Sequence, residues 1–257
     1  MTNHDANHDE LIMAQFSKQA IPFSTIADHS DQAIFNLIIN TSKITAQDKV
    51  LDVACGPGMM SLAIAKHAKA VTGIDKVPAM IERVQQLQSE QGIENIDWAV
   101  GDMYNLPYPD NSFDVVITRY SFHHLLYPLK GMVEMKRVCK NGGRVSIIDV
   151  APLPESQKGY NQVEKLRDPS TTKALTPDQF LSLAEEAGLK NIDNKYYKLP
   201  REIEDQLANS FPNPGDDQKI RELIKADLGQ NNTGFSPQMI EGKIYMNYPQ
   251  IIMVCQK

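Results

Sequence analysis

Three aspartates occupy comparable places in the first half of the chain. Asp52 precedes a glycine turn at 56–58, Asp75 ends the next apolar run, and Asp102 lies just past a third run. Carboxylates at the ends of parallel strands meet along one edge of a sheet, where they can accept hydrogen bonds or attract a cation. Glycines beside them let a ligand approach the backbone closely. This pattern predicts a nucleotide-like ligand at that edge.

The surroundings of Asp52 separate two kinds of nucleotide-like ligand. Ser61 stands where the dinucleotide-binding fingerprint has glycine or alanine, and a carboxylate just before the turn would repel a pyrophosphate. It would attract the sulfonium and ammonium groups of S-adenosylmethionine. Asp75 suits the ribose of either ligand. Asp102 and the backbone N–H of Met103 suit an adenine, which favours S-adenosylmethionine.

The segment RYSFHHLL follows the fourth apolar run and contains Arg119, Tyr120, His123 and His124. Histidine is the side chain best suited to act as a base near neutral pH, and a base assists methylation of a hydroxyl or an acidic carbon. Adjacent residues of a helix or strand face different directions, so we expect at most one histidine to point into the site. His123 is favoured because it lies nearer the strand end. Alternatively, each histidine only caps or packs under the following helix.

Arginines beside this segment have two interpretations each. Arg119 is either a site residue or an ordinary charge at a strand edge. Arg167, in the sequence RDPS, could hold an anionic substrate, but Asp-Pro-Ser is also an ordinary turn sequence. The turn is the favoured interpretation.

Strands and helices that must position these residues alternate along the chain. Apolar runs at 49–54, 70–75, 96–100, 113–118 and 143–149 are rich in Val and Ile, as buried parallel strands are. Amphipathic segments lie between them at 59–67, 78–91 and 129–139. Asn141, Gly142 and Gly143 are expected to end the last helix. The alternation predicts right-handed crossovers in a doubly wound sheet.

After residue 149 the pattern changes. A polar stretch leads to a helix whose start is marked by Thr176 as N-cap, Pro177 and the capping-box residue Gln179. Strand candidates at 191–199 and 246–255 follow, and a charged helical region at 201–228 and a loop at 229–236 lie between them. We expect this half of the chain to supply a substrate lid.

Composition excludes several classes of protein. The 257 residues carry a formal net charge of -6 and no cluster of Lys and Arg, which argues against a nucleic-acid partner. Cys55, Cys139 and Cys255 are too few and too widely spaced for a zinc site, and an odd number fits a reducing compartment. An acidic N-terminus and the lack of a long apolar run argue against a signal peptide and membrane insertion. We expect a cytoplasmic protein without a metal.

The ordered motifs resemble those of class I S-adenosylmethionine-dependent methyltransferases, most closely the ubiquinone/menaquinone biosynthesis-like branch. They are Asp52-x-x-x-Gly56-x-Gly58, Asp75, Gly101-Asp102, LPYPDNSFDVV and GGRVSIIDV, and they span roughly residues 50–150. The later segment RDPSTTKALTPDQFLSLAEEAGL is similar to the tail of small methyltransferases of the Bacillus YcgJ group. The resemblance implies an α/β fold with a doubly wound, mostly parallel seven-stranded sheet, a terminal hairpin, an N-terminal helical segment and an inserted C-terminal lid.

Site residues can be carried over from this resemblance by position. The implied cofactor-binding residues are Asp52, Ala54, Gly56 and Gly58 at the methionine part, Asp75 at the ribose, Lys76 and Met80 at the border of ribose and adenine, Asp102 and Met103 at the base, and Arg119. The segment at 14–30 would close over the cofactor, with Phe16 and Phe23 walling the substrate cavity beside Tyr120 and Arg167. Alternatively, the two phenylalanines form one apolar stripe of a helix packed on the sheet.

We therefore expect an enzyme that uses S-adenosylmethionine to methylate oxygen or carbon of a small, aromatic or quinone-like molecule by in-line displacement. The alternatives are an NAD-dependent oxidoreductase and a cofactor-binding module without catalysis. No tyrosine is followed by lysine four residues later, which argues against the oxidoreductase. The expected organisation is a helical lid segment at 1–45, a cofactor-binding core at 46–151 and a substrate lid with the last strands at 152–257. A homodimer is left open.

Overall fold

One mixed sheet forms the centre of the computed structural model, which describes residues 3–25 and 29–257. Its order is β3-β2-β1-β4-β5-β8-β6, and a short β7 pairs with β8. The strands are β1 (Lys49–Val53), β2 (Ala70–Asp75), β3 (Ile96–Val100), β4 (Phe113–Arg119), β5 (Cys139–Val150), β6 (Lys190–Glu202), β7 (Gln238–Ile240) and β8 (Lys243–Gln256). Strands β1 to β5 pair in parallel, whereas β8 is antiparallel to both β5 and β6. The seven-stranded order with a terminal hairpin is thus confirmed, and β7 is an addition to it.

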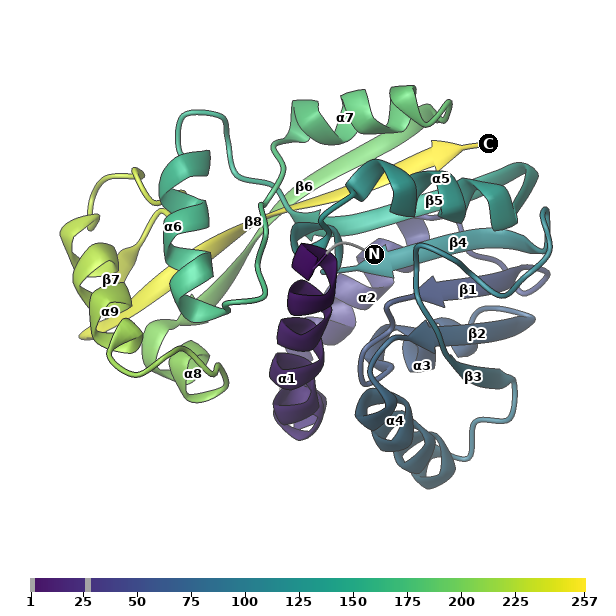
Figure 1. The fold of residues 1–257 in the computed structure, drawn as a ribbon, viewed down its shortest axis with the longest axis horizontal. Coiled ribbons are helices and arrows are strands. Elements are labelled where there is room, and N and C mark those ends of the chain that lie inside the picture. Colours follow the sequence, from purple (N-terminus) through teal and green to yellow (C-terminus); the bar gives the residue numbers. More distant parts are fainter. Residues whose placement is uncertain (1–2, 26–28) are drawn as a thin grey trace.

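Helices cover both faces of this sheet (Figure 1). They are α1 (Asn3–Thr25), α2 (His29–Thr41), α3 (Met59–Ala65), α4 (Pro78–Gln91), α5 (Pro128–Val138), α6 (Gln157–Arg167), α7 (Pro177–Glu186), α8 (Ile203–Ala208) and α9 (Asp216–Ala226). One core cluster contains buried residues of α2, α3 and α4, such as Ile38, Ile64 and Val84. The other contains Met132 of α5 and Phe180 of α7. Both cores lie against the Val- and Ile-rich strands, as expected of buried parallel strands.

Helix boundaries test the predicted end signals. The capping box of α7 is confirmed, because the Thr176 side chain accepts from the backbone of Gln179 and the Gln179 side chain bonds back to Thr176. The helix predicted at 129–139 corresponds to α5, but the prediction that Asn141, Gly142 and Gly143 form its end is wrong. Helix α5 ends at Val138, and β5 already begins at Cys139, which pairs with Phe113 across a β-bulge. The glycines lie in the irregular part of the strand before Arg144, where their backbone exchanges hydrogen bonds with Lys257.

The region predicted to act as a lid, residues 152–257, is built on the long strands β6 and β8, which run beyond the rest of the sheet to α6, α8, α9 and β7 (Figure 1). It has its own core, in which the rings of Tyr160 and Phe235 stack at 4.5 Å and Phe235 meets Tyr248 edge-on at 4.9 Å. The predicted helical region at 201–228 is two helices, because β6 extends to Glu202 and a loop separates α8 from α9.

Helix α1 lies between the group α6, α8 and α9 and the parallel part of the sheet (Figure 1). Polar contacts hold it there: Asp9 pairs with Lys76 at 2.6 Å, and Asp5 accepts a hydrogen bond from the Tyr127 hydroxyl at 2.9 Å. Nε2 of His8 also lies 2.7 Å from the carbonyl oxygen of His124. Across the described ranges, none of the helices has the length and apolar character that crossing a membrane requires.

Candidate active site

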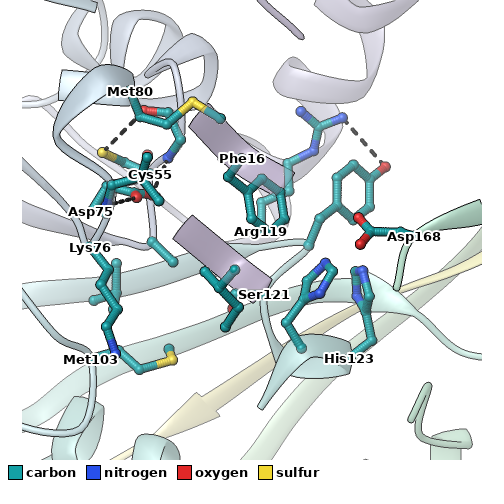
Figure 2. A pocket seen from close by; sticks show the side chains of 18 of the residues that line it. Phe16, Cys55, Asp75, Lys76, Met80, Met103, Arg119, Ser121, His123 and Asp168 are labelled. Carbon is teal, nitrogen blue, oxygen red and sulfur yellow. Dashed lines mark hydrogen bonds between the residues drawn. The ribbon is translucent and has the colours of Figure 1, made fainter. Parts of the chain in front are cut away.

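A cavity of about 480 Å³ lies where the strand ends of β1 to β4, helix α1 and the predicted lid region meet. The predicted site residues that line it are Phe16, Asp52, Ala54, Gly56, Asp75, Lys76, Met80, Asp102, Met103, Arg119, Tyr120, His123, His124 and Arg167. Gly58 is not among the lining residues, and the side chain of Phe23 lies outside the described residues. In Figure 2, Phe16 stands between a cofactor end with Asp75, Lys76 and Met80 and an acceptor end with His123 and Asp168.

The turn after β1 places glycines in two different roles. Both Gly56 and Gly58 adopt left-handed backbone conformations, with φ of 55° and 74°. A Cβ at Gly58 would collide with Val84 and Trp98, so this glycine lets the turn pack against α4 and β3. A Cβ at Gly56 would meet nothing within 4 Å. Gly56 is therefore the glycine that leaves room on the cavity side.

Asp52 is the most deeply buried acid of the cofactor end, with 1% of its surface exposed. The Ser61 hydroxyl, at the start of α3, donates to its carboxylate at 2.6 Å. Burial raises the pKa of Asp52 to about 7, against the lowering effect of this hydrogen bond. A cation in the cavity would favour the ionised carboxylate. Ser61, a departure from the dinucleotide fingerprint, thus holds the acid that distinguishes the two ligands.

Asp75 fastens the same turn to the end of β2. Its two carboxylate oxygens accept the N–H groups of Gly56 at 2.8 Å and Val77 at 2.9 Å. Burial raises its pKa, and these backbone hydrogen bonds oppose the shift. Each oxygen of a carboxylate has a second lone pair. Asp75 can therefore accept ribose hydroxyl groups while it holds the turn.

Lys76 and Asp102 meet at the adenine end. The ammonium of Lys76 lies 3.2 Å from Asp102 and 2.6 Å from Asp9, so it links α1 to the loop after β3. The other oxygen of Asp102 accepts the N–H of Tyr104. Met80 is fully buried beside Val77, and Phe16 packs against this pair from α1. The predicted base-binding residues are thus brought together under α1.

His123 is held by an acid for which sequence reasoning predicted no role. Its Nδ1 lies 2.6 Å from one carboxylate oxygen of Asp149. The same oxygen accepts the backbone N–H of Val150, and the other oxygen accepts the backbone N–H of Phe122. Burial disfavours charge on the ring, but the Asp149 carboxylate outweighs it and raises the pKa of His123. The sequence did contain a signal for this contact. Asp149 lies near the end of β5 and the histidines follow β4, and neighbouring parallel strands end at the same edge of a sheet.

Both histidines line the cavity, so the expectation that at most one does is wrong. They lie in a 3-10 turn, η1 (Phe122–His124), rather than in a helix or strand, and their ring centroids are 4.1 Å apart. The Nδ1 of His124 lies 3.1 Å from the Ser170 hydroxyl, which donates to Asp168 at 2.6 Å. Burial, and then the neighbouring His123, lower the pKa of His124 to about 3.

The remaining predicted residues also line the cavity. Arg167 is the last residue of α6 and binds Glu164 with two hydrogen bonds, at 2.9 and 2.7 Å. Asp168 and Ser170 form the turn that the sequence favoured, yet Arg167 also lines the cavity. The guanidinium of Arg119 lies over the Tyr120 ring, 4.4 Å from its centroid. The Phe16 ring meets His124 edge-on at 5.0 Å.

Comparison with known proteins identifies the family of this chain. A family model described as "Methyltransferase domain" matches residues 51–147. The uncharacterized methyltransferase YcgJ of Bacillus subtilis is 31% identical over 188 residues, covering 70% of this chain and 74% of that protein. Its crystal structure has a TM-score of 0.81 at 24% identity, covering 89% of this chain and 99% of that chain.

Two further proteins extend the comparison. The ubiquinone/menaquinone biosynthesis C-methyltransferase UbiE of Bdellovibrio bacteriovorus is 32% identical over 155 residues, 58% of this chain and 65% of that protein. Geranyl diphosphate C-methyltransferase of Streptomyces coelicolor A3(2), solved with S-adenosyl-L-homocysteine, has a TM-score of 0.61 at 14% identity, covering 87% of this chain and 77% of that chain. These findings decide against the oxidoreductase alternative. The chain belongs to the class I S-adenosylmethionine-dependent methyltransferases.

Proposed function

We propose that this enzyme methylates oxygen or carbon of a small, aromatic or quinone-like acceptor, with His123 as the general base. The observation that carries the proposal is the hydrogen bond of 2.6 Å between His123 and buried Asp149 at the acceptor end of the cavity. An aspartate on Nδ1 fixes the ring so that Nε2 of the neutral imidazole can accept a proton.

The cofactor end offers groups that fit S-adenosylmethionine. When bound, the cofactor supplies an electrophilic methyl group. We assign Asp52 to its cationic methionine part, Asp75 to the ribose, and Asp102 with Met103 to the adenine. Ala54 and Gly56 would border the methionine part, Lys76 and Met80 the ribose and adenine, and Arg119 the end of β4, while Gly58 shapes the turn. The burial of Asp52 supports this assignment, because an acid with a pKa of about 7 gains from a cationic neighbour.

At the acceptor end, His123 would take the proton from a hydroxyl or an acidic carbon as the new bond forms. Helix α1 and the lid would exclude water and align the reacting atoms, which is the main contribution an enzyme makes to an in-line displacement. Apolar and aromatic residues support an aromatic or quinone-like acceptor: Phe16, Tyr120, Val150, Leu199 and Tyr248 line the cavity. His124 is a positioning or binding residue in this proposal.

The proposal includes the organisation and setting of the chain. Residues 1–45 would act as a helical lid, 46–151 as the cofactor-binding core, and 152–257 as the substrate lid with the last strands. The separate core around Tyr160 supports the last assignment. The three cysteines are free, which supports a cytoplasmic setting. A homodimer is the remaining open point, and light scattering at micromolar concentration tests it.

Release of S-adenosylhomocysteine, measured over a panel of phenols, quinols and 1,3-diketones, tests the function. We expect turnover with at least one acceptor, and His123→Gln should reduce kcat by roughly 100-fold or more. Calorimetry should show that the variant binds S-adenosylhomocysteine with unchanged affinity. An exposed histidine in a matched control, His67→Gln, should leave both quantities unchanged. Full turnover by His123→Gln would contradict the base assignment.

A further inference from the structure

The two histidines of η1 present a pair of hydrogen-bond acceptors to one cavity. We propose that they select an acceptor molecule with hydroxyl groups on two neighbouring carbons of a planar ring, and that Nε2 of His123 and Nε2 of His124 each accept one of them. This inference rests on the proposed function, because it takes His123 to be the base at the methylated oxygen. It adds the chemical class of the acceptor and a binding role for His124.

A hydrogen-bond chain fixes the tautomer of His124. Ionised Asp168 can only accept, so the single proton of the Ser170 hydroxyl goes to it across 2.6 Å. The Ser170 oxygen must then accept from Nδ1–H of His124, 3.1 Å away. The same Asp168 oxygen also accepts the backbone N–H of Ser170 at 2.9 Å, and these two donated hydrogen bonds favour the ionised acid. Neutral His124 therefore carries its proton on Nδ1 and has a lone pair on Nε2.

The neutral state of His124 persists over the physiological range. Burial and the neighbouring His123 lower its pKa to about 3. His124 is thus unsuited to hold a proton that it removes from a substrate. It is suited to accept a hydrogen bond from one.

His123 repeats this arrangement with a different acid. Asp149 occupies its Nδ1, so Nε2 is again the remaining nitrogen. Within the described part of the chain, neither Nε2 makes a hydrogen bond, and both residues line the cavity although each is only 6% exposed. Each Nε2 is therefore available to a ligand in the cavity. A ligand with two hydroxyls can donate to both nitrogens, whereas a ligand with one hydroxyl leaves the other nitrogen to water.

The geometry points to neighbouring hydroxyls. The ring centroids lie 4.1 Å apart, so two donors that meet both rings must themselves be close together. Oxygens on adjacent carbons of a planar ring meet this condition, whereas oxygens on opposite sides of a ring do not. The edge of Phe16 beside His124, at 5.0 Å between centroids, and the Tyr120 ring supply apolar surface for a flat molecule.

Binding of three simple phenols tests the proposal without turnover. Catechol, 2-methoxyphenol and phenol are titrated calorimetrically into the enzyme saturated with S-adenosylhomocysteine. We expect catechol to bind roughly tenfold more tightly than either of the others, the effect of one additional buried hydrogen bond. Equal affinities for all three compounds, or no binding of any of them, would overturn the proposal.

Variants connect this preference to His124. Ser170→Ala removes the partner of Nδ1 and should reduce the catechol preference to about threefold or less, whereas the surface control Ser112→Ala should retain it. Nitrogen NMR of the wild-type enzyme checks the tautomer even if Ser170→Ala fails to fold, and a proton on Nε2 of His124 would overturn the proposal. If His123→Gln kept full turnover, the base assignment would fail, and the catechol preference of the wild-type enzyme would be judged separately.

Discussion

The Ser61 hydroxyl and the Asp52 carboxylate are joined by a hydrogen bond of 2.6 Å, and both side chains are buried. The bond connects the end of β1 with the first turn of α3. It stabilises the ionised form of an acid whose pKa burial raises to about 7. The protonation state of Asp52 near neutral pH therefore depends on Ser61.

Ser61→Ala should weaken the binding of S-adenosylmethionine. Without the hydroxyl, the pKa of Asp52 rises further, and more of the protein carries an uncharged acid at pH 7. We expect the dissociation constant to increase roughly tenfold, the usual effect of losing one hydrogen bond to a charged group. Isothermal titration calorimetry at pH 7 measures it, with Ser112→Ala as control. An unchanged dissociation constant would show that Asp52 does not face the cationic part of the cofactor.

Asp52→Asn should stabilise the ligand-free protein while it weakens cofactor binding. The pKa of Asp52 is raised from 3.8 to about 7 on folding, so its charge disfavours the folded state at pH values above 3.8, and this cost reaches its full size above pH 7. At pH 8 the variant should melt at a higher temperature than the wild type, and its free energy of unfolding should be larger by up to a few kcal/mol. Both differences should vanish near pH 4. Equal melting temperatures at pH 8 would argue against a buried charge.

The parallel half of the sheet could be predicted closely because each strand is a continuous apolar run. The run at 70–75 coincides with β2 and the run at 96–100 with β3. The start of β5 could not be predicted. Gly142 and Gly143 are typical of helix ends, but contacts distant in sequence take this segment into the strand: Cys139 pairs with Phe113, and both glycines bond to Lys257.

Residues of the site that act through local backbone were predictable, and those that act through distant partners were not. Gly56 belongs to the turn between β1 and α3, and Asp75 ends β2, the strand that follows this helix. The role of Asp149 depends on its meeting His123, 26 residues away, and that of Ser170 on its meeting His124, 46 residues away. The two histidines face one cavity because these partners and the 3-10 turn orient them. The expectation that adjacent side chains face different directions applies to helices and strands, and this segment is neither.

Alanine at the two glycines of the turn should separate stability from binding. Gly58→Ala places a Cβ against Val84 and Trp98 at a φ of 74°, so we expect a loss of several kcal/mol in folding stability. Gly56→Ala meets no neighbour and should lose only about 1–2 kcal/mol to its left-handed φ, yet its methyl group projects into cofactor space. Urea denaturation and cofactor titration measure the two effects. Equal stability losses would contradict this division.

Asp149→Asn should move the pH dependence of methyl transfer. Asp149 outweighs the effect of burial and holds the pKa of His123 above 6.5, so charged His123 stabilises the fold below pH 6.5, and this contribution is lost as pH rises through the folded-state pKa. A base must be neutral, so kcat/KM should rise with pH through that same pKa. In Asp149→Asn the rise should occur at lower pH, with a maximal rate reduced roughly 100-fold or more.

Asp168→Asn, which alters the partner of Ser170 instead, is the control and should leave the position of the rise nearly unchanged. A profile that keeps its midpoint in Asp149→Asn would mean that another group supplies the base.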